Sequence, residues 1–359
     1  MEKRRNGAID FLKFVFSVMI VLYHGRNLGN PENPIFRSGK VAVEFFFIVS
    51  GYLMAAKAEQ ISCRENLRIG EETSSFILGK IKTLLPHTLL AFVIGYSAAM
   101  FLSANPIAYV KKLPYSIWEV SFLWMSGLGE EWINGQTWYL SSMLLVMLVL
   151  YPIAIKNFDV FSKVVAPAVG VLVLGWIAKE QGFLATYKND AWTGTVYNGN
   201  LRALSEICIG TISYELAKVL SKMNFTKLGS VLVALTEWGL YLTVIIWGGN
   251  SRSYGKLFVS VFLLCVAIAL TFSEKGFFSN WFNKKPFYWL GNFSFILYLN
   301  HITAGAILKK VIPDQPYCIM IVMFVVFSFA LSFVCYFIGL LMRKHGMRLL
   351  LRFQKKLFT

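Results

Sequence analysis

Charge is scarce in this sequence, and it is unevenly distributed. Only 15% of the 359 residues are Asp, Glu, Lys or Arg, and they gather in short groups between long apolar runs. A soluble domain is about 45–50% apolar, whereas 56% of the residues here are hydrophobic. No polar stretch is long enough to form a second, soluble domain. We therefore expect residues 1–359 to form a single domain that has lipid as its solvent.

Three further features are missing. The five cysteines show no Cys-x-x-Cys spacing and mostly lie inside apolar runs, which argues against a metal site or a disulfide framework. No small-residue cleavage site lies near the basic residues 1–5, so the first apolar run is expected to be a retained helix and not a signal peptide. There is no internal repeat and no matching pair of interrupted helices, which argues mildly against a secondary transporter.

The apolar runs predict an all-α integral membrane protein with about ten transmembrane helices. Crossing about 30 Å of hydrocarbon takes about 20 apolar residues in a helix. The ten predicted helices cover residues 8–28, 39–57, 78–103, 137–155, 162–178, 200–220, 230–248, 254–272, 287–308 and 317–342. In the longest connection, 105–136, the apolar stretch 117–125 is too short to span and is expected to be a re-entrant or interfacial helix.

The net charge of +16 raises the possibility of nucleic-acid binding. The basic residues, however, lie at the ends of the apolar runs, where they act as topology signals and contact lipid headgroups. An even number of helices places both termini on one side, and most of the Lys and Arg residues fall on that side. We therefore expect a multi-pass protein of the cell membrane, without a nucleic-acid partner, whose termini and basic tail 343–359 are cytoplasmic.

The first predicted helix carries ionisable side chains, which are costly inside a membrane. Lys13 and His24 are eleven residues apart, or about three turns, so they share one face with Ser17 between them. Asp10 lies one turn before Lys13 and can pair with it. This polar stripe predicts a functional site. The alternative is that Lys13 extends to the headgroups and that His24 is an interfacial or satisfied core histidine.

Two further motifs follow this pair along the chain. Residues 44–52 read EFFFIVSGY, and residues 138–140 read WYL, followed by Tyr151-Pro152. The predicted ninth helix contains LGNFSFILYLNH at residues 290–301. Together with Lys13-x10-His24, and in this order, they resemble the motifs of the acyltransferase-3 family of membrane O-acyltransferases. The resemblance extends from residue 10 to about residue 310.

This resemblance implies transfer of an acyl group, often acetyl, from a cytoplasmic acyl-CoA to a cell-surface or lipid-linked glycan. It makes Lys13 and His24 the functional pair, acyl-CoA the co-substrate, and Trp138 and Tyr139 part of the cavity. The branch resembled is that of bacterial polysaccharide O-acetyltransferases without an appended esterase-like domain. No permanently bound cofactor or metal is expected.

Two positions depart from the family pattern. The basic motif R-x-x-R-L-x-P of the third helix reads KIKTLLP at residues 80–86, so Thr83 replaces its second arginine, and Lys82 is the candidate substitute. Some members carry a glutamate five residues after the tryptophan of the fourth helix, where this chain has Met143.

Transfer to a hydroxyl requires a base, and a neutral histidine suits this role. We expect His24 to be that base, with an acyl-histidine intermediate as a variant. His301 is predicted at a similar depth. Ser294, Tyr298 and His301 follow i, i+4, i+7 spacing, which makes one polar face that either lines the cavity or ends the helix at the interface.

The histidine also needs a partner to fix its tautomer, and Glu44 is expected at the same depth. The alternative is that Glu44 is a rim carboxylate. Ser50 and Gly51 indicate either substrate contact or close helix packing. The cavity is therefore expected between the first, second and ninth helices.

Basic residues near the inner side suit the phosphates of the donor. Lys13, Lys80 and Lys82 are the expected ligands. Arg202 and Glu206 are one turn apart in the sixth predicted helix, where they either line the cavity or form an ion pair that locks the bundle.

One rival function is a polytopic exporter of polysaccharide or lipid, which also needs polar faces. Catalysis requires the imidazole of His24, whereas transport tolerates other polar side chains there. A purely structural subunit would leave the lysine–histidine stripe unexplained.

Overall fold

The computed structural model describes residues 5–29, 35–128, 133–182, 184, 196–250, 253–313 and 315–357. Within these ranges every regular element is helical, which confirms the predicted all-α class. The long helices are α1 (Gly7–His24), α2 (Ala42–Ser62), α3 (Ile69–Leu102), α6 (Trp138–Lys156), α8 (Ala166–Gln181), α9 (Asn198–Lys222), α10 (Lys227–Asn250), α11 (Tyr254–Ser273), α12 (Lys285–Val311) and α13 (Tyr317–Leu357). The short helices are α4 (Pro106–Lys112), α5 (Ile117–Val120) and α7 (Phe158–Val160).

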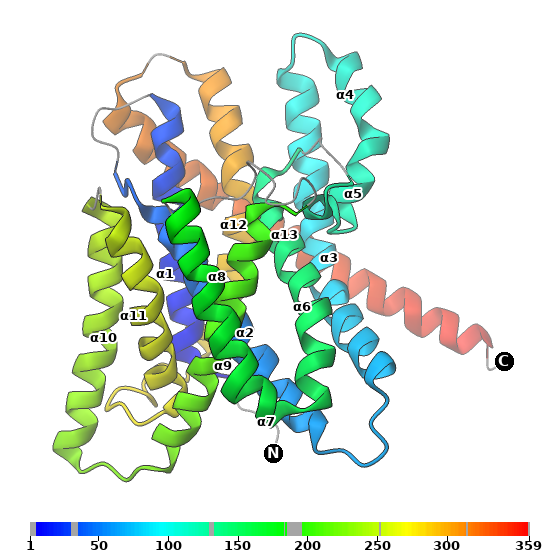
Figure 1. Ribbon diagram of the computed structural model, residues 1–359. Coiled ribbons are helices and arrows are strands. Elements are labelled where there is room, and N and C mark those ends of the chain that lie inside the picture. The colour runs from blue at the N-terminus through cyan, green and yellow to red at the C-terminus, as the bar shows by residue number, and fades with distance from the viewer. Residues whose placement is uncertain are drawn as a thin grey trace.

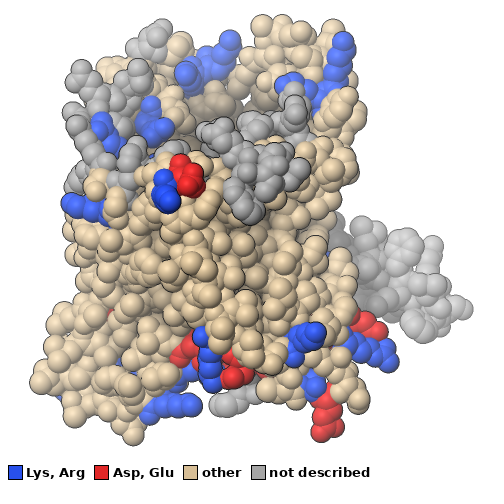
Figure 2. Space-filling view, viewed as in Figure 1, with Lys and Arg blue, Asp and Glu red and all other residues tan. Residues whose placement is uncertain are grey.

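The bundle has the composition of a membrane protein. Eight of the long helices in the described part are apolar enough to cross a membrane. The other two, α9 and α12, are also long but carry buried polar side chains, because they lie inside the bundle and pack against several other helices. Figure 2 shows most charged side chains gathered towards two ends of the visible face, with a broad uncharged zone between them. That zone is where lipid would surround the protein.

Helices α1 and α12 lie side by side and run in the same direction. At one end, the backbone nitrogen of Gly7 donates to the Asn283 side chain at 3.0 Å. Farther along, Gly291 lies against Asp10. At the other end, the rings of His24 and His301 are adjacent. Polar residues that are far apart in the sequence therefore share the same depth.

Helices α2 and α9 cross at two glycines. A Cβ atom added to Gly51 would lie 2.1 Å from the carbonyl oxygen of Ile207, and one added to Gly210 would lie 2.2 Å from that of Ile48. Neither contact is possible for a real side chain. Close helix packing, and not substrate contact, therefore accounts for Gly51.

The connection between α3 and α6 lies at the end of the bundle opposite the N-terminus (Figure 1). The expected re-entrant or interfacial helix over residues 117–125 does not form: α5 ends at Val120, and Phe122 adopts a positive φ of 61°. Glu119 anchors this region, because its carboxylate accepts the backbone N–H groups of Ile133 and Asn134 at 2.8 and 2.9 Å. Burial raises the pKa of Glu119, and these two hydrogen bonds oppose the shift.

Two helices are longer than the sequence predicted. Helix α3 begins at Ile69, nine residues before the expected start, and α13 continues to Leu357 through the segment predicted as a basic tail. Hydropathy marks only the lipid-facing length of a helix. In α3, Glu71 and Glu72 occupy the first turn, where the helix dipole favours negative charge.

Candidate functional site

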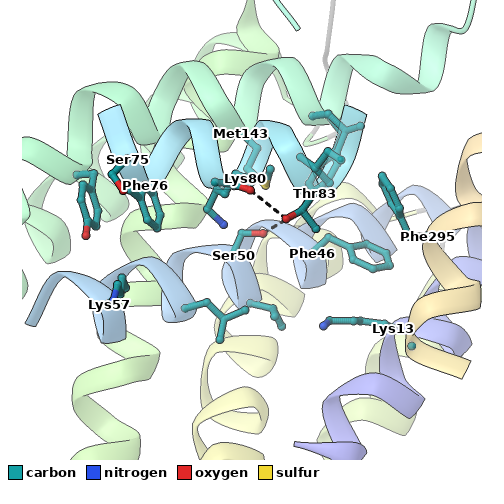
Figure 3. A pocket seen from close by; sticks show the side chains of 18 of the residues that line it. Lys13, Phe46, Ser50, Lys57, Ser75, Phe76, Lys80, Thr83, Met143 and Phe295 are labelled. Atoms are coloured by element: carbon teal, nitrogen blue, oxygen red, sulfur yellow. Dashed lines mark hydrogen bonds between the residues drawn. The ribbon is translucent and has the colours of Figure 1, made fainter. Parts of the chain in front are cut away.

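A pocket of about 870 Å³ lies between α1, α2, α3, α6 and α12 (Figure 3). Seven residues expected at the site line it: Lys13, Ser17, Ser50, Lys80, Tyr139, Ser294 and Tyr298. At one end the lining includes Arg64, Glu71 and Glu72, whose side chains reach the surface. The pocket therefore opens at the end of the bundle where α3 begins. It involves five helices, whereas the sequence predicted three.

Lys13 and Ser17 bring the polar stripe of α1 to the pocket wall. Lys13 Nζ lies 3.2 Å from Asp10 Oδ1, and Arg5 also bonds to the Asp10 carboxylate. Asp10 itself is buried against Gly291 and does not line the pocket. The Ser17 hydroxyl is buried and has no hydrogen-bond partner within the described residues, so it is available to a ligand.

The two lysines of α3 point in different directions. Lys80 lines the pocket, and its ammonium lies 5.1 Å from the ring centroid of Phe76. In Figure 3, Lys13 and Lys80 approach the pocket from opposite walls, with Ser50 of α2 between them. Lys82 is exposed and is not part of the lining. Lys82, expected to hold the donor, therefore does not reach this pocket, because two residues turn a side chain by about 200° on a helix.

Three aromatic rings close the far end of the pocket. The centroids of Phe46, Tyr139 and Tyr298 lie 6.1 to 6.5 Å from one another. The hydroxyl of Tyr139 lies 3.1 Å from that of Ser50, and the hydroxyl of Tyr298 donates to the carbonyl oxygen of Gln136 at 2.6 Å. These bonds hold both tyrosines in place. Ser50 therefore contributes to this wall, while Gly51 faces α9.

His24 and His301 lie beyond this aromatic wall. Their ring centroids are 5.1 Å apart, and the Tyr298 ring is 5.9 Å from that of His301. His301 is fully buried, and its Nδ1 lies 2.6 Å from the carbonyl oxygen of Tyr298. His24 Nδ1 and His301 Nε2 are both buried without hydrogen-bond partners in the described structure. The two imidazoles thus leave nitrogen atoms available next to Tyr298, which lines the pocket.

Glu44 is not the partner of His24, contrary to the prediction. Its carboxylate accepts from the guanidinium of Arg202 at both oxygens, one of them 2.8 Å from Nε. Glu206 contributes a second carboxylate to Arg202, with an Nε–Oε1 distance of 3.4 Å. Glu44 also lies away from the level of His24, because the neighbouring Phe45 ring stacks on Phe16, about two turns before His24 in α1. The partner of Glu44 is set by the side of α2 that faces α9, and sequence does not reveal this.

Arg202, Glu206 and Trp138 lie outside the pocket lining. Arg202 and Glu206 are buried, and the half-buried Trp138 packs against them, with the Arg202 guanidinium carbon 5.5 Å from its ring centroid. Of the two alternatives left open by the sequence, the structure shows the ion pair that joins α2 to α9. Removing one member of such a pair costs about 3–5 kcal/mol, because it leaves a buried charge uncompensated.

Sequence reasoning missed several lining residues near the opening. Lys57 of α2 and Arg64 after it add two positive charges, while Glu71, Glu72 and Ser75 come from α3. The sequence does contain a pattern that indicates this face of α3. Glu72, Ser75, Gly79 and Thr83 recur at helical spacing, which predicts one polar face. Met143 and Thr83, the two departures from the family pattern, both line the pocket.

A family model described as an acyltransferase domain matches residues 6–337, which is nearly the whole chain. The matched region contains the pocket, the aromatic wall and both histidines. No curated protein and no solved structure matches the chain.

Proposed function

Because the chain belongs to the acyltransferase-3 family of membrane acyltransferases, we propose that it transfers an acyl group, such as acetyl, from cytoplasmic acyl-CoA to a hydroxyl of a cell-surface or lipid-linked glycan. The observation that carries this proposal is an arrangement of residues: the pocket is open at one end of the bundle and ends at an aromatic wall, and the adjacent rings of His24 and His301 lie next to the Tyr298 ring of that wall.

The open end of the pocket suits the donor. Acyl-CoA is anionic at its nucleotide end, and the phosphates need several cations. Lys57 and Arg64 stand near the opening and Lys80 lies farther inside. Arg64 is paired with Glu72, whereas Lys80 has the Phe76 ring as its neighbour and forms no salt bridge with any carboxylate among the described residues. We therefore assign Lys80 to a donor phosphate, with Lys57 as a second ligand.

Lys13 and Ser17 continue the path towards the histidines. Lys13 is positively charged and forms an ion pair with Asp10. The Ser17 hydroxyl is free to form a hydrogen bond with an amide of the pantetheine arm. The thioester would then reach Phe46, Tyr139 and Tyr298. These rings must separate slightly for the acyl carbon to meet an acceptor beside His24.

His24 would act as the general base. The acceptor hydroxyl oxygen attacks the thioester carbonyl while a ring nitrogen of His24 takes the hydroxyl proton. The carbon–sulfur bond then breaks, the ester forms, and the proton passes from the imidazolium to the CoA thiolate. The glycan acceptor is inferred from the motif resemblance, and the position of His24 at the end of α1 opposite the donor opening suits an acceptor from the other side.

The test uses inside-out membrane vesicles that contain the protein and radiolabelled acetyl-CoA added outside them. Label that becomes membrane- or polymer-bound, and that mild alkali releases as acetate, reports an O-acetyl ester. We expect His24→Ala to reduce this rate by about 100- to 10,000-fold, the usual contribution of a general base. The matched control, His87→Ala, should retain most of the activity, because His87 packs against Phe295 and not against the histidine pair.

Wild-type rates in a folded His24→Ala protein would refute the catalytic role. Absence of acetyl transfer by the wild-type protein, together with glycan export that persists in His24→Gln, would favour the exporter alternative, since transport needs a polar side chain and not an imidazole.

A further inference from the structure

The hydrogen-bond partner that fixes the tautomer of His24 is not Glu44, which the sequence predicted. A neutral histidine base needs a group that fixes which nitrogen carries the proton. Glu44 cannot serve, because Arg202 holds both of its carboxylate oxygens. Asp10 lies at the opposite end of α1, where Lys13 and Arg5 bond to it. The group that does lie beside His24 is a second imidazole.

The tautomer of His301 follows from its hydrogen bond. Nδ1 lies 2.6 Å from the backbone carbonyl oxygen of Tyr298, which can only accept. Nδ1 must therefore carry the proton, and in the neutral ring Nε2 has a free lone pair. This Nε2 is fully buried and has no partner in the described structure. A buried acceptor without a donor is costly, so it is expected to acquire one.

The complementary atom is Nδ1 of His24, which is also buried and unpartnered. The two ring centroids are 5.1 Å apart, and the planes are inclined by 50°. A hydrogen bond between them requires the His24 side chain to turn Nδ1 towards His301. Catalytic hydrogen bonds commonly tighten only when the substrate is bound.

We propose that His301 is the positioning residue of His24: its Nε2 accepts a hydrogen bond from His24 Nδ1–H, which leaves His24 Nε2 as the base. This proposal rests on the proposed function. When His24 Nε2 takes the proton of the acceptor hydroxyl, the imidazolium stays bonded to His301. His24 Nε2 then gives this proton to the CoA thiolate. His301 exchanges no proton in the reaction, and the Tyr298 carbonyl holds it in the required tautomer.

Two substitutions separate this role from a merely structural one. In His301→Gln, the amide oxygen can occupy the place of Nε2 and accept from His24. In His301→Asn, the shorter amide reaches only the place of Nδ1, so it can keep the bond to Tyr298 but cannot reach His24. Positioning through Nε2 therefore predicts that the Gln variant is the more active.

The experiment measures acetyl transfer from radiolabelled acetyl-CoA in vesicles, with kcat and KM for acetyl-CoA determined separately. We expect His301→Asn to lower kcat about 100-fold or more, His301→Gln to recover at least a tenth of the wild-type kcat, and KM to stay unchanged in both. Higher activity in Asn than in Gln, or equal losses in the two, would overturn the role of His301. If the wild-type protein transferred no acetyl group, the proposed function would fail instead.

A second measurement uses the wild-type protein and therefore does not depend on whether the variants fold. Nitrogen-15 NMR of histidine-labelled protein in detergent micelles distinguishes the two neutral tautomers. We expect both His24 and His301 to carry their proton on Nδ1. A His24 proton on Nε2 in the neutral ring would contradict the proposal directly.

Discussion

Lys80 and Lys82 are separated by one residue on α3, yet only Lys80 faces the pocket. A hydrogen bond to a charged group contributes about 1.5–3 kcal/mol, which corresponds to about 10- to 100-fold in affinity. We therefore expect Lys80→Ala to raise KM for acetyl-CoA by about that factor with little change in kcat. Lys82→Ala is the matched control, because it removes an exposed lysine from the same helix. Equal effects of the two substitutions would mean that Lys80 acts only as part of the general positive charge.

Lys13 differs from Lys80 because a carboxylate already accompanies it. Its proposed task is to hold negative charge on the donor, and this needs a cation and not a titrating amine. Lys13→Ala should weaken the use of acetyl-CoA, whereas Lys13→Arg should keep much of it. Steady-state kinetics in the vesicle assay measure both. If Arg and Ala were equally inactive, Lys13 would have a role other than binding an anion.

At the scale of elements, the crossing of α2 and α9 determines the shape of the site. Ser50 faces the pocket, where its hydroxyl bonds to that of Tyr139. The next residue, Gly51, faces α9 and allows the two helices to pack closely. The buried Glu44–Arg202 pair joins the same two helices. A shift of α2 away from α9 would therefore move Phe46 and Ser50 with it, and would change the pocket as well as the stability.

We expect Gly51→Ala to destabilise the protein by more than about 2 kcal/mol, because overpacking a close contact commonly costs 1–3 kcal/mol and the new Cβ meets a rigid backbone oxygen. The control is Gly175→Ala on α8, where a Cβ meets nothing within 4 Å. There, alanine should be neutral or stabilising by up to about 1 kcal/mol. Thermal unfolding in detergent measures both. A Gly51→Ala protein as stable as Gly175→Ala would show that the helices can separate at no cost.

At the scale of the whole molecule, the prediction concerns which end of the bundle faces the cytoplasm. Two exposed cysteines lie at opposite ends of the bundle. Cys63 follows α2 near the pocket opening. Cys318 begins α13 beside Tyr317, whose hydroxyl accepts from the backbone nitrogen of Ile35 at 3.2 Å in the loop between α1 and α2. Gly129, in the connection 105–136 that the predicted topology places outside the cell, lies outside the described residues.

We expect a membrane-impermeant maleimide added to intact cells to label Cys318 and not Cys63, because acyl-CoA is cytoplasmic and the pocket opens near Cys63. Cys318→Ser and Cys63→Ser identify the site of labelling, and lysed cells provide the control in which Cys63 reacts. Labelling of Cys63 alone in intact cells would reverse the topology and would remove the pocket from the donor side.

Sequence alone determined the class of the protein and the composition of much of its site. Long apolar runs require helices in lipid, because every backbone polar group must be bonded within its own segment. The cost of burying charge singled out Lys13 and the helices that carry polar residues. The order of the motifs indicated the family, which the match over residues 6–337 confirms.

Only the tertiary structure decided which side chains meet. Depth along a helix can be counted from the sequence, and it correctly predicted that His24 and His301 lie at one level. Depth does not say which way a side chain faces or which helices are neighbours. For this reason Glu44 bonds to Arg202 and not to His24, and Lys82, on the right helix, faces outward. The lateral packing of the ten long helices, set by contacts such as Gly51 against Gly210, determines which side chains face one another.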